Sequence, residues 1–137
     1  MTKEDKQLLL EDLCCRLPFG VMAKYYGMEE EMDCIDTIEA IYTDNPDKPE
    51  FVIGQYSLYL GSFKPYLRDL SDMTKQEIEE FMSIPDFVQC FGEKEYCCLL
   101  HTNKFVWLNQ HHFDYRGLIK KGLAIRVTTD DNPYATN

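Results

Sequence analysis

The sequence lacks the short motifs that mark the common cofactor-binding and hydrolytic folds. It contains no Gly-x-Gly-x-x-Gly, no Gly-x-x-x-x-Gly-Lys, no Gly-x-Ser-x-Gly and no calcium-binding loop. Each of these motifs gathers backbone amides, a nucleophile or carboxylates around one ligand, so the strongest sequence signals for nucleotide, hydrolase or calcium chemistry are missing. We therefore expect no bound cofactor.

Long apolar runs are absent as well. The leucine run at 8–10 is followed directly by Glu11 and Asp12, so it is too short for the apolar part of a signal peptide. The longest uncharged apolar-rich stretch, residues 51–63, is too short to span a bilayer as a helix. We expect no export and no membrane segment, and hence a cytoplasmic protein.

Cys-x-x-Cys pairs are missing although the chain has six cysteines. These are Cys14, Cys15, Cys34, Cys90, Cys97 and Cys98. An even count would suggest disulfides in a smaller secreted protein, but the expected compartment is reducing. The missing spacing also disfavours zinc and redox chemistry. We expect reduced thiols that pack as small apolar side chains, and no metal.

Positive charge is scarce. The chain has 14 Lys and Arg residues against 24 Asp and Glu residues, a formal net charge of −10. The resulting negative potential repels phosphate backbones and anionic membranes, so direct nucleic-acid binding is disfavoured. Acidic residues are dense between positions 29 and 50. Six of them are the candidate partner-binding residues: Glu29, Glu30, Glu31, Asp33, Asp36 and Glu39.

Three interpretations of this acidic stretch stay open. It can be a solvated face, a surface that docks on a basic protein partner, or an imitation of DNA that occupies a nucleic-acid-binding protein. The second and third both require a partner whose binding weakens at high salt.

The 137 residues, of which 45% are hydrophobic, are enough for one domain with one core. Thr2 and Asp5 predict the cap of an N-terminal helix at about 2–16. Residues 19–60 are predicted to be rich in strands, residues 74–127 helical and mixed, and residues 130–137 a tail. No linker divides the chain, so a single domain over 1–137 is expected.

The pattern within these regions predicts individual elements. Expected strands lie at 19–28, 34–43, 51–53, 55–60 and 123–127, and Gly54 is a candidate bulge. Thr74 and Glu77 form a capping box for a short helix that ends near Pro85. Residues 86–100 fit helix and strand equally, and a further helix is expected from 102 or 103 to about 112. Strands followed by helices indicate an α+β fold, an antiparallel β-meander sheet with helices packed on one face.

One cluster concentrates residues capable of acid–base chemistry: His111, His112, Asp114 and Arg116. Adjacent histidines on a helix point about 100° apart, which disfavours a shared metal. In one interpretation a histidine acts as general base, Asp114 orients its ring and Arg116 holds an anionic substrate. In the other, the cluster is framework: His112 bonds a backbone carbonyl, and Asp114 and Arg116 pair with each other or cap chain ends.

The chain has nine tyrosines, and several of them fall in the predicted strands. They include Tyr25, Tyr26, Tyr56, Tyr59 and Tyr66. Tyrosine is common in interfaces because its rigid ring has one polar end, so these residues could line a groove. The alternative is that they alternate between the core and the surface of the sheet.

Three stretches resemble a known family. They are the run 107–124 (WLNQHHFDYRGLIKKGLA), the opening 8–21 (LLLEDLCCRLPFGV) and residues 64–67 (KPYL). They resemble a family of small uncharacterised proteins encoded by gut bacteria and their phages and mobile elements. The resemblance implies an intracellular protein and, for phage-associated genes, contact with a host protein. It implies no activity, cofactor or catalytic residue.

The prediction from the sequence is a non-enzymatic protein-interaction domain with an unidentified protein partner. The first alternative is a small enzyme or ligand-binding protein that uses the histidine cluster. The second is an acidic DNA mimic that inhibits a nucleic-acid-binding protein.

Overall fold

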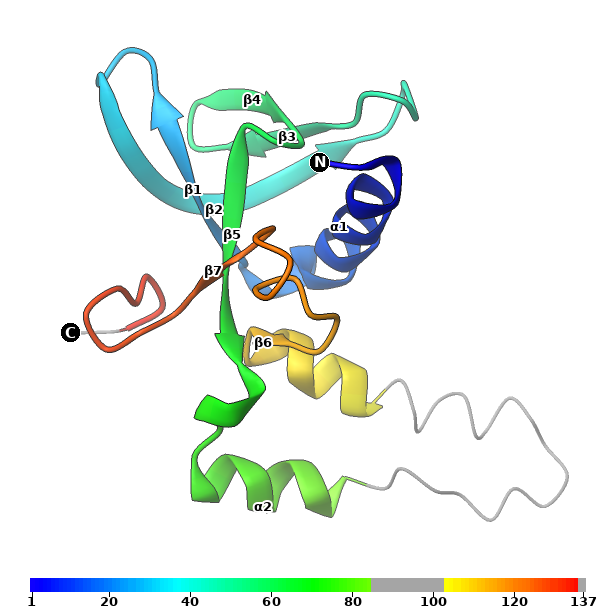
Figure 1. The fold of residues 1–137 in the computed structure, drawn as a ribbon, viewed down its shortest axis with the longest axis vertical. Coiled ribbons are helices and arrows are strands. Elements are labelled where there is room, and N and C mark those ends of the chain that lie inside the picture. The colour runs from blue at the N-terminus through cyan, green and yellow to red at the C-terminus, as the bar shows by residue number, and fades with distance from the viewer. Residues whose placement is uncertain (85–102, 136–137) are drawn as a thin grey trace, which may run out of the picture.

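The computed structural model describes residues 1–84 and 103–135 (Figure 1). The elements in chain order are α1 (Lys3–Arg16), the short 3-10 helix η1 (Leu17–Phe19), β1 (Met22–Gly27), β2 (Met32–Tyr42), β3 (Glu50–Ile53), β4 (Tyr56–Tyr59), β5 (Phe63–Asp69), the 3-10 helix η2 (Leu70–Asp72), α2 (Lys75–Ser83), a helix at 103–110, β6 (Phe113–Asp114) and β7 (Ile125–Arg126).

The strands form a mixed, mostly antiparallel sheet in the order β4-β3-β2-β1-β5-β6, and β7 also pairs with β5. Strands β1 to β4 make the expected antiparallel meander, and β5 returns antiparallel to β1. The two-residue strands β6 and β7 run parallel to β5. The α+β prediction is therefore confirmed, with parallel pairings that the meander prediction did not include.

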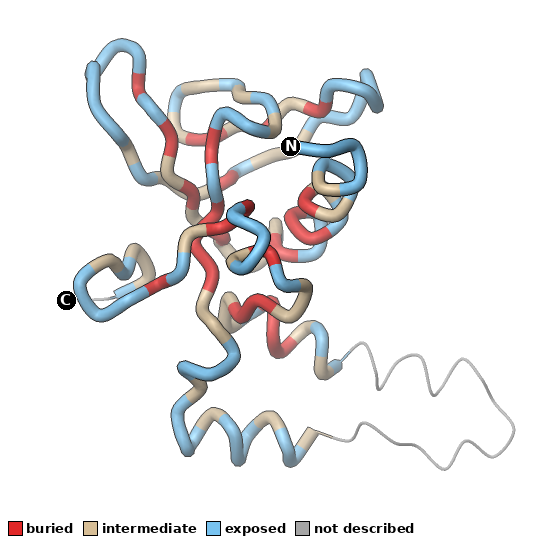
Figure 2. The backbone as a smooth tube through the Cα atoms, viewed as in Figure 1, coloured by how far each residue is buried: buried red, intermediate tan, exposed pale blue. Residues whose placement is uncertain are grey.

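The core lies between α1 and one face of this sheet. A capping box starts α1, because the Asp5 N–H donates to Thr2 Oγ1 (3.0 Å) and the Thr2 N–H donates to Asp5 Oδ2 (3.2 Å). Leu9 and Leu13 on α1 are fully buried against the inward side chains of the strands. Figure 2 shows the buried residues gathered where α1 and the strands meet.

A β-bulge in β2 determines which side chains face outward. The pairing shifts register between Ile38 and Ala40, so Ile38 faces the core while Ala40 and Tyr42 join the opposite face. We call this opposite side the outer face. It contains Lys24, Tyr26, Asp33, Ile35, Tyr42, Glu50, Val52, Tyr59 and Lys64, as the cross-strand pairs require.

Strand β5, which joins β1 to β6 and β7, was not predicted from the sequence. Phe63, Pro65, Tyr66 and Leu67 are buried, so the strand has no clear alternation of apolar and polar residues. A strand covered on both faces reads as a continuous apolar run, and Pro65 argued further against a strand. The predicted boundary between a strand-rich first half and a helical second half was therefore placed too early.

The helices α2 and 103–110 pack on each other beyond the end of β5 (Figure 1). The Thr74–Glu77 capping box is present at the start of α2. Phe81 of α2 contacts Trp107 with 5.5 Å between ring centroids, and Trp107, Leu108 and Phe113 form a second, smaller core. This layer places residues 111–116 between the two cores.

The C-terminal residues 130–135 are not a free tail. The Met22 N–H donates to the hydroxyl of Tyr134 (2.9 Å), which donates to the Tyr66 carbonyl (2.7 Å). Met22 and Tyr66 would be the next pair after Ala23 and Pro65 in the β1–β5 ladder. The tyrosine hydroxyl thus replaces a ladder hydrogen bond where the two strands separate.

Other predicted elements differ in their ends. The last helix ends at residue 110 instead of 112, and the final strand contains two residues. Gly54 lies in the two-residue turn between β3 and β4, with φ at +59°, and not in a bulge. The ambiguous segment 86–100 lies outside the described residues. Within the residues that the structure describes, no helix is both long and apolar enough to cross a membrane.

Candidate functional site

His111 follows the helix at 103–110 and faces α2. Its ring lies on Trp107 with a centroid distance of 4.1 Å, and its Nδ1 is 3.8 Å from Glu77 Oε2. Both oxygens of Glu77 already accept from Arg68 at 2.7 Å. The hydrogen bonds from Arg68 lower the pKa of Glu77 to about 2. His111 therefore lies at the edge of an ion pair that is complete without it.

His112 points elsewhere because its backbone is left-handed, with φ at +64°. Its ring stacks on Tyr134 with 3.7 Å between centroids and 9° between planes. Its Nδ1 is buried and has no hydrogen-bond partner among the described residues. Burial first, and then the nearby charges of Arg16 and Arg68, lower the pKa of His112 to about 4. The imidazole is neutral at pH 7 and serves as an aromatic surface, not as the carbonyl-bonded ring considered from the sequence.

Asp114 holds the turn that follows β6. Its carboxylate accepts from the backbone N–H groups of Arg116 (3.2 Å), Leu118 (3.0 Å) and Ile119 (2.9 Å). This is the capping role that a carboxylate performs at a turn or helix start. Asp114 makes no hydrogen bond to either histidine within residues 1–84 and 103–135, so the geometry gives the general-base arrangement no support.

Arg116 joins an ion-pair network with two residues of α1. Arg16 donates to Asp12 through Nε (2.6 Å) and Nη2 (3.1 Å), and both side chains are fully buried. Arg16 Nη2 also donates to the Phe113 carbonyl (2.6 Å). Arg116 Nε lies 3.2 Å from Asp12 Oδ1, an ion pair without an aligned hydrogen bond. Two arginines thus neutralise one buried carboxylate and tie α1 to β6.

Tyr115 lies between the two arginines. The guanidinium carbons of Arg16 and Arg116 are each 5.2 Å from its ring centroid, within cation–π range. Its hydroxyl donates to Asn109 Oδ1 (3.0 Å). No role at this site was predicted from the sequence for Asp12, Arg16, Tyr115 or Asn109. The i, i+4 spacing of Asp12 and Arg16 was the available signal, because such residues share a helix face.

One pocket borders this region. It has a volume of about 500 Å³ and is lined by Cys15, Phe19, Phe105, Val106, Asn109, Tyr115 and Arg116. Of the four predicted site residues, only Arg116 lines it. The Arg116 Nη2 group lies 3.9 Å from Cys15 Sγ. The pocket is mainly apolar, and none of the described residues that line it is a histidine.

The acidic candidates divide into two groups. Three of them bond inside the protein: the Tyr25 hydroxyl donates to Asp36 (2.5 Å), the Tyr56 hydroxyl to Glu30 (2.8 Å), and Gln55 Nε2 to both Glu29 and Glu30. A Cβ on Gly54 would lie 2.6 Å from the Tyr25 hydroxyl and 2.8 Å from Asp36, so this network requires glycine at the turn.

Glu31, Asp33 and Glu39 are exposed and have no internal partner in the described part of the chain. Asp33 and Asp36 lie on opposite faces of β2. DNA mimicry needs carboxylates in one row, and the six carboxylates therefore do not have this arrangement.

Three of the six cysteines are described. Cys14 and Cys15 are exposed free thiols, which differs from the expected packing as small apolar side chains, and Cys34 is a half-buried free thiol. Cys90, Cys97 and Cys98 lie outside the described residues. No group of three or more His, Cys, Asp or Glu side chains with metal-binding geometry occurs among the described positions.

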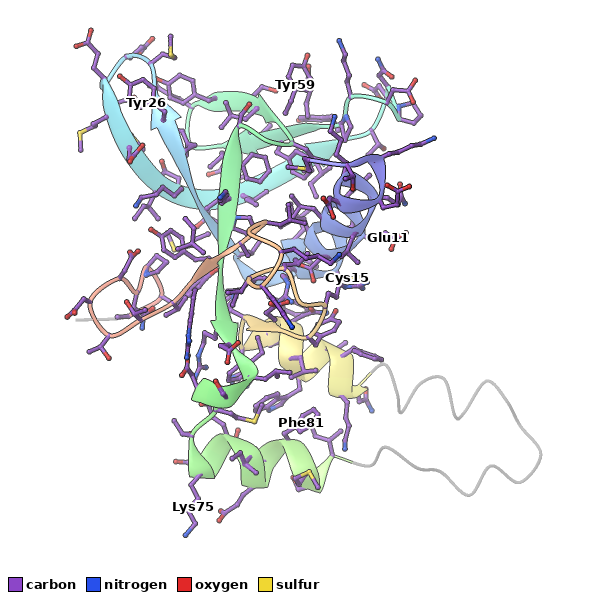
Figure 3. All side chains as sticks on the ribbon, viewed as in Figure 1. Glu11, Cys15, Tyr26, Tyr59, Lys75 and Phe81 are labelled. Atoms are coloured by element: carbon purple, nitrogen blue, oxygen red, sulfur yellow. The ribbon has the colours of Figure 1, made fainter. Side chains whose placement is uncertain are left out.

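The five tyrosines singled out from the sequence divide between the two faces. Tyr25 and Tyr66 are buried, Tyr56 is half-buried with its ring edge against Tyr25 (5.6 Å), and Tyr26 and Tyr59 are exposed on the outer face. Figure 3 shows Tyr26 and Tyr59 at the end of the molecule away from α2. Alternation across the sheet accounts for this division.

Comparisons of the chain with protein-family models, with curated proteins and with solved structures find no match. The resemblance to small proteins of gut bacteria and phages stays a prediction.

Proposed function

We propose that this protein is a non-enzymatic interaction domain that binds a basic protein partner through its outer face. The observation that carries the proposal is the exposure of four large side chains there. Tyr26, Ile35, Tyr42 and Tyr59 are 53%, 39%, 54% and 48% exposed. Tyrosine anchors are enriched in protein interfaces because they bury a large area at a low cost in side-chain entropy.

The charge beside these side chains supports a basic partner. Asp33 is paired across the strands with Tyr26, and the turn at 29–31 follows β1 directly. Asp33 and Glu31 have no internal partner in the described residues, so their carboxylates are free to meet cations. Lys24 and Lys64 lie on the same face, but the net charge of −10 favours a positively charged surface opposite it.

Cytoplasmic residence and a phage or mobile-element origin belong to the same proposal. Both rest on the sequence alone: the first on its lack of long apolar runs, the second on the resemblance in 8–21, 64–67 and 107–124. A host protein as the partner is consistent with both.

A quantitative affinity experiment tests this proposal. The wild-type protein, a Y26S/Y59S variant and an I78S/M82S control are used as bait in extracts of the cells that encode them. Ile78 and Met82 are 48% and 68% exposed on α2, so the control removes comparable apolar surface from another part of the molecule.

The expected result is a protein retained by the wild type and the control and reduced about tenfold or more by Y26S/Y59S. The purified pair should then bind one to one, and more weakly as salt increases. Equal retention by all three baits would contradict the proposal.

A further inference from the structure

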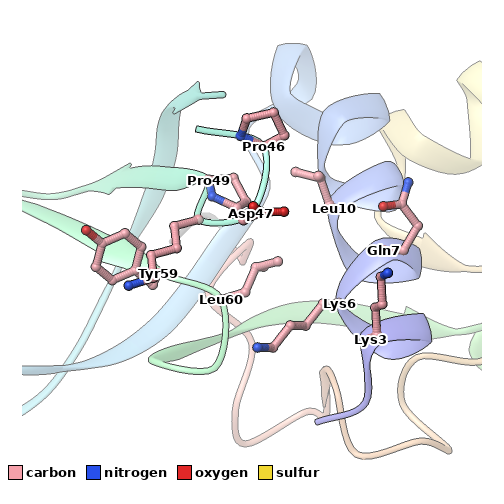
Figure 4. Close-up of a pocket in the computed structure, with 10 residues that line it drawn as sticks. Lys3, Lys6, Gln7, Leu10, Pro46, Asp47, Pro49, Tyr59 and Leu60 are labelled. Carbon is pink, nitrogen blue, oxygen red and sulfur yellow. The ribbon is translucent and has the colours of Figure 1, made fainter. Parts of the chain in front are cut away.

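A second site lies between the first turns of α1 and the segments that flank β3 and β4 (Figure 4). It is a pocket of about 340 Å³ lined by Lys3, Lys6, Gln7, Leu10, Pro46, Asp47, Lys48, Pro49, Tyr59 and Leu60. Its volume falls in the range of small-molecule sites. The pocket is separate from the histidine cluster and shares only Tyr59 with the outer face.

Three lysines line this pocket in a protein whose net charge is −10. Lys3 and Lys6 lie on the stripe of α1 that continues through Leu10, since positions three and four apart share a helix face. Lys48 approaches from the turn before β3. None of the three lysines forms an ion pair within residues 1–84 and 103–135. Among the described residues that line the pocket, Asp47 is the only carboxylate, so the lysines outnumber it.

The walls are held by local structure. The capping box at Thr2 and Asp5 orders the start of α1. Across the pocket, the Lys48 N–H donates to the Asn45 carbonyl (3.0 Å) and the Asp47 N–H donates to Asn45 Oδ1 (3.1 Å). Pro46 and Pro49 restrict the backbone on both sides of this turn. The lysine side chains are flexible, but their backbone positions are fixed before any ligand arrives.

The remaining wall is apolar. Leu10 and Leu60 are half-buried, and Figure 4 shows Leu60 and Tyr59 opposite the lysines of α1. We propose that this pocket binds a small organic anion, with a carboxylate or phosphate head among Lys3, Lys6 and Lys48 and an apolar body against Leu10, Tyr59 and Leu60. Ammonium groups bind such heads as point charges, and the apolar wall adds burial of the body.

Ligand titrations of the full chain followed by NMR test the chemistry. The probes are phenyl phosphate, phenylacetate, inorganic phosphate and benzyl alcohol. At least one phenyl-bearing anion should bind saturably and shift the amides of Leu10 and Leu60, and the stronger of the two identifies the head group. Inorganic phosphate and benzyl alcohol should each bind about tenfold more weakly or not at all.

Matched charge variants distinguish binding by the pocket lysines from a general effect of the protein's charge on anion binding. K3Q/K48Q and K75Q/K120Q each remove two positive charges, and Lys75 and Lys120 are exposed residues outside the pocket. K3Q/K48Q should weaken the phenyl anion about tenfold or more, whereas K75Q/K120Q should stay within about twofold. Circular dichroism checks that both variants fold.

Three results would overturn the proposal. They are no saturable binding of either phenyl anion, equal binding of benzyl alcohol or inorganic phosphate, and equal weakening by both double variants. None of them depends on a protein partner, so the proposal for this pocket can be contradicted while the proposal for the outer face is supported.

Discussion

The histidine-containing corner and the outer face differ in how their chemical groups are used. At the corner, Asp12, Arg16 and Asp114 are buried and bonded to one another or to the backbone. On the outer face, Tyr26 and Tyr42 are more than half exposed. Polar groups that already bond inside the protein have few donors or acceptors left for a ligand, whereas exposed aromatic rings keep most of their surface available for contact. At this corner, the buried charged side chains bond to other parts of the same chain.

The reason lies in the position of the corner between two cores. Residues 111–116 must connect the helix at 103–110 to the sheet, and β6 is only two residues long. Such a short pairing cannot hold α1, β5 and the helical layer together by backbone bonds alone. The arginines supply charged donors to a carboxylate and to a carbonyl, which are about twice as strong as neutral hydrogen bonds.

The largest expected effect concerns Arg16. R16M removes the bidentate partner of a buried carboxylate and leaves the Phe113 carbonyl without its donor. We expect the free energy of unfolding to fall by about 3–5 kcal/mol, measured by urea denaturation.

The matched control is R126M, which removes an exposed arginine paired with Asp72 (2.9 Å, 48% and 41% exposed). It should cost about 1 kcal/mol or less. Equal costs for the two variants would remove the distinction between a framework corner and an ordinary surface.

A smaller effect should appear as a pH dependence. The folded pKa of His112 is lowered from 6.5 to about 4, so the unfolded chain takes up a proton at higher pH than the folded protein does. The stability that comes from a neutral His112 is therefore complete above about pH 6.5 and is lost as the pH falls toward 4. The loss should be about 2 kcal/mol, because the ring is partly buried.

The variant that checks this assignment is H112N. Asparagine tolerates the left-handed backbone of this position better than most residues do. Urea denaturation of H112N between pH 7 and pH 4 should show a flatter profile, although its overall stability is lower. E77Q should keep the loss of stability between pH 6.5 and 4. The pKa of Glu77 is lowered from 4.5 to about 2, so this group changes the stability only below about pH 4.5. A step that survives H112N would assign the pH dependence to another group.

The parts of the fold that follow local rules could be predicted from the sequence. The capping boxes at Thr2 and Thr74 bring donors and acceptors together within a few residues, and both occur. Strand β5 could not be predicted, because its buried residues Phe63, Pro65, Tyr66 and Leu67 do not alternate with polar residues, and its partners β1, β6 and β7 come from distant parts of the chain. Tyr134 is a similar case, since its hydroxyl bonds to the backbone of Met22 and Tyr66, which are 112 and 68 positions earlier in the chain.

The candidate site was predicted as a set of neighbours in sequence, which explains why the structure does not bring its four side chains together. His111, His112, Asp114 and Arg116 are close along the chain, but a left-handed residue and a two-residue strand turn their side chains in different directions. The partners that determine their roles, Asp12, Arg16, Glu77 and Tyr134, lie far away in sequence. Proximity along the chain indicates a site only where regular structure directs the side chains to one point.

The smallest expected effect on stability concerns the outer face. It tests the comparison with the histidine-containing corner by removing an exposed ring instead of a buried charge. Y26S removes a ring that is 53% exposed on the outer face and is not part of the core cluster around Leu9 and Leu13. The free energy of unfolding should change by about 0.5 kcal/mol or less, measured by the same denaturation as R16M. A cost above about 2 kcal/mol would mean that the ring packs as core does. A near-neutral result combined with lost partner retention would show that this aromatic surface contributes to binding and not to folding, the reverse of Arg16.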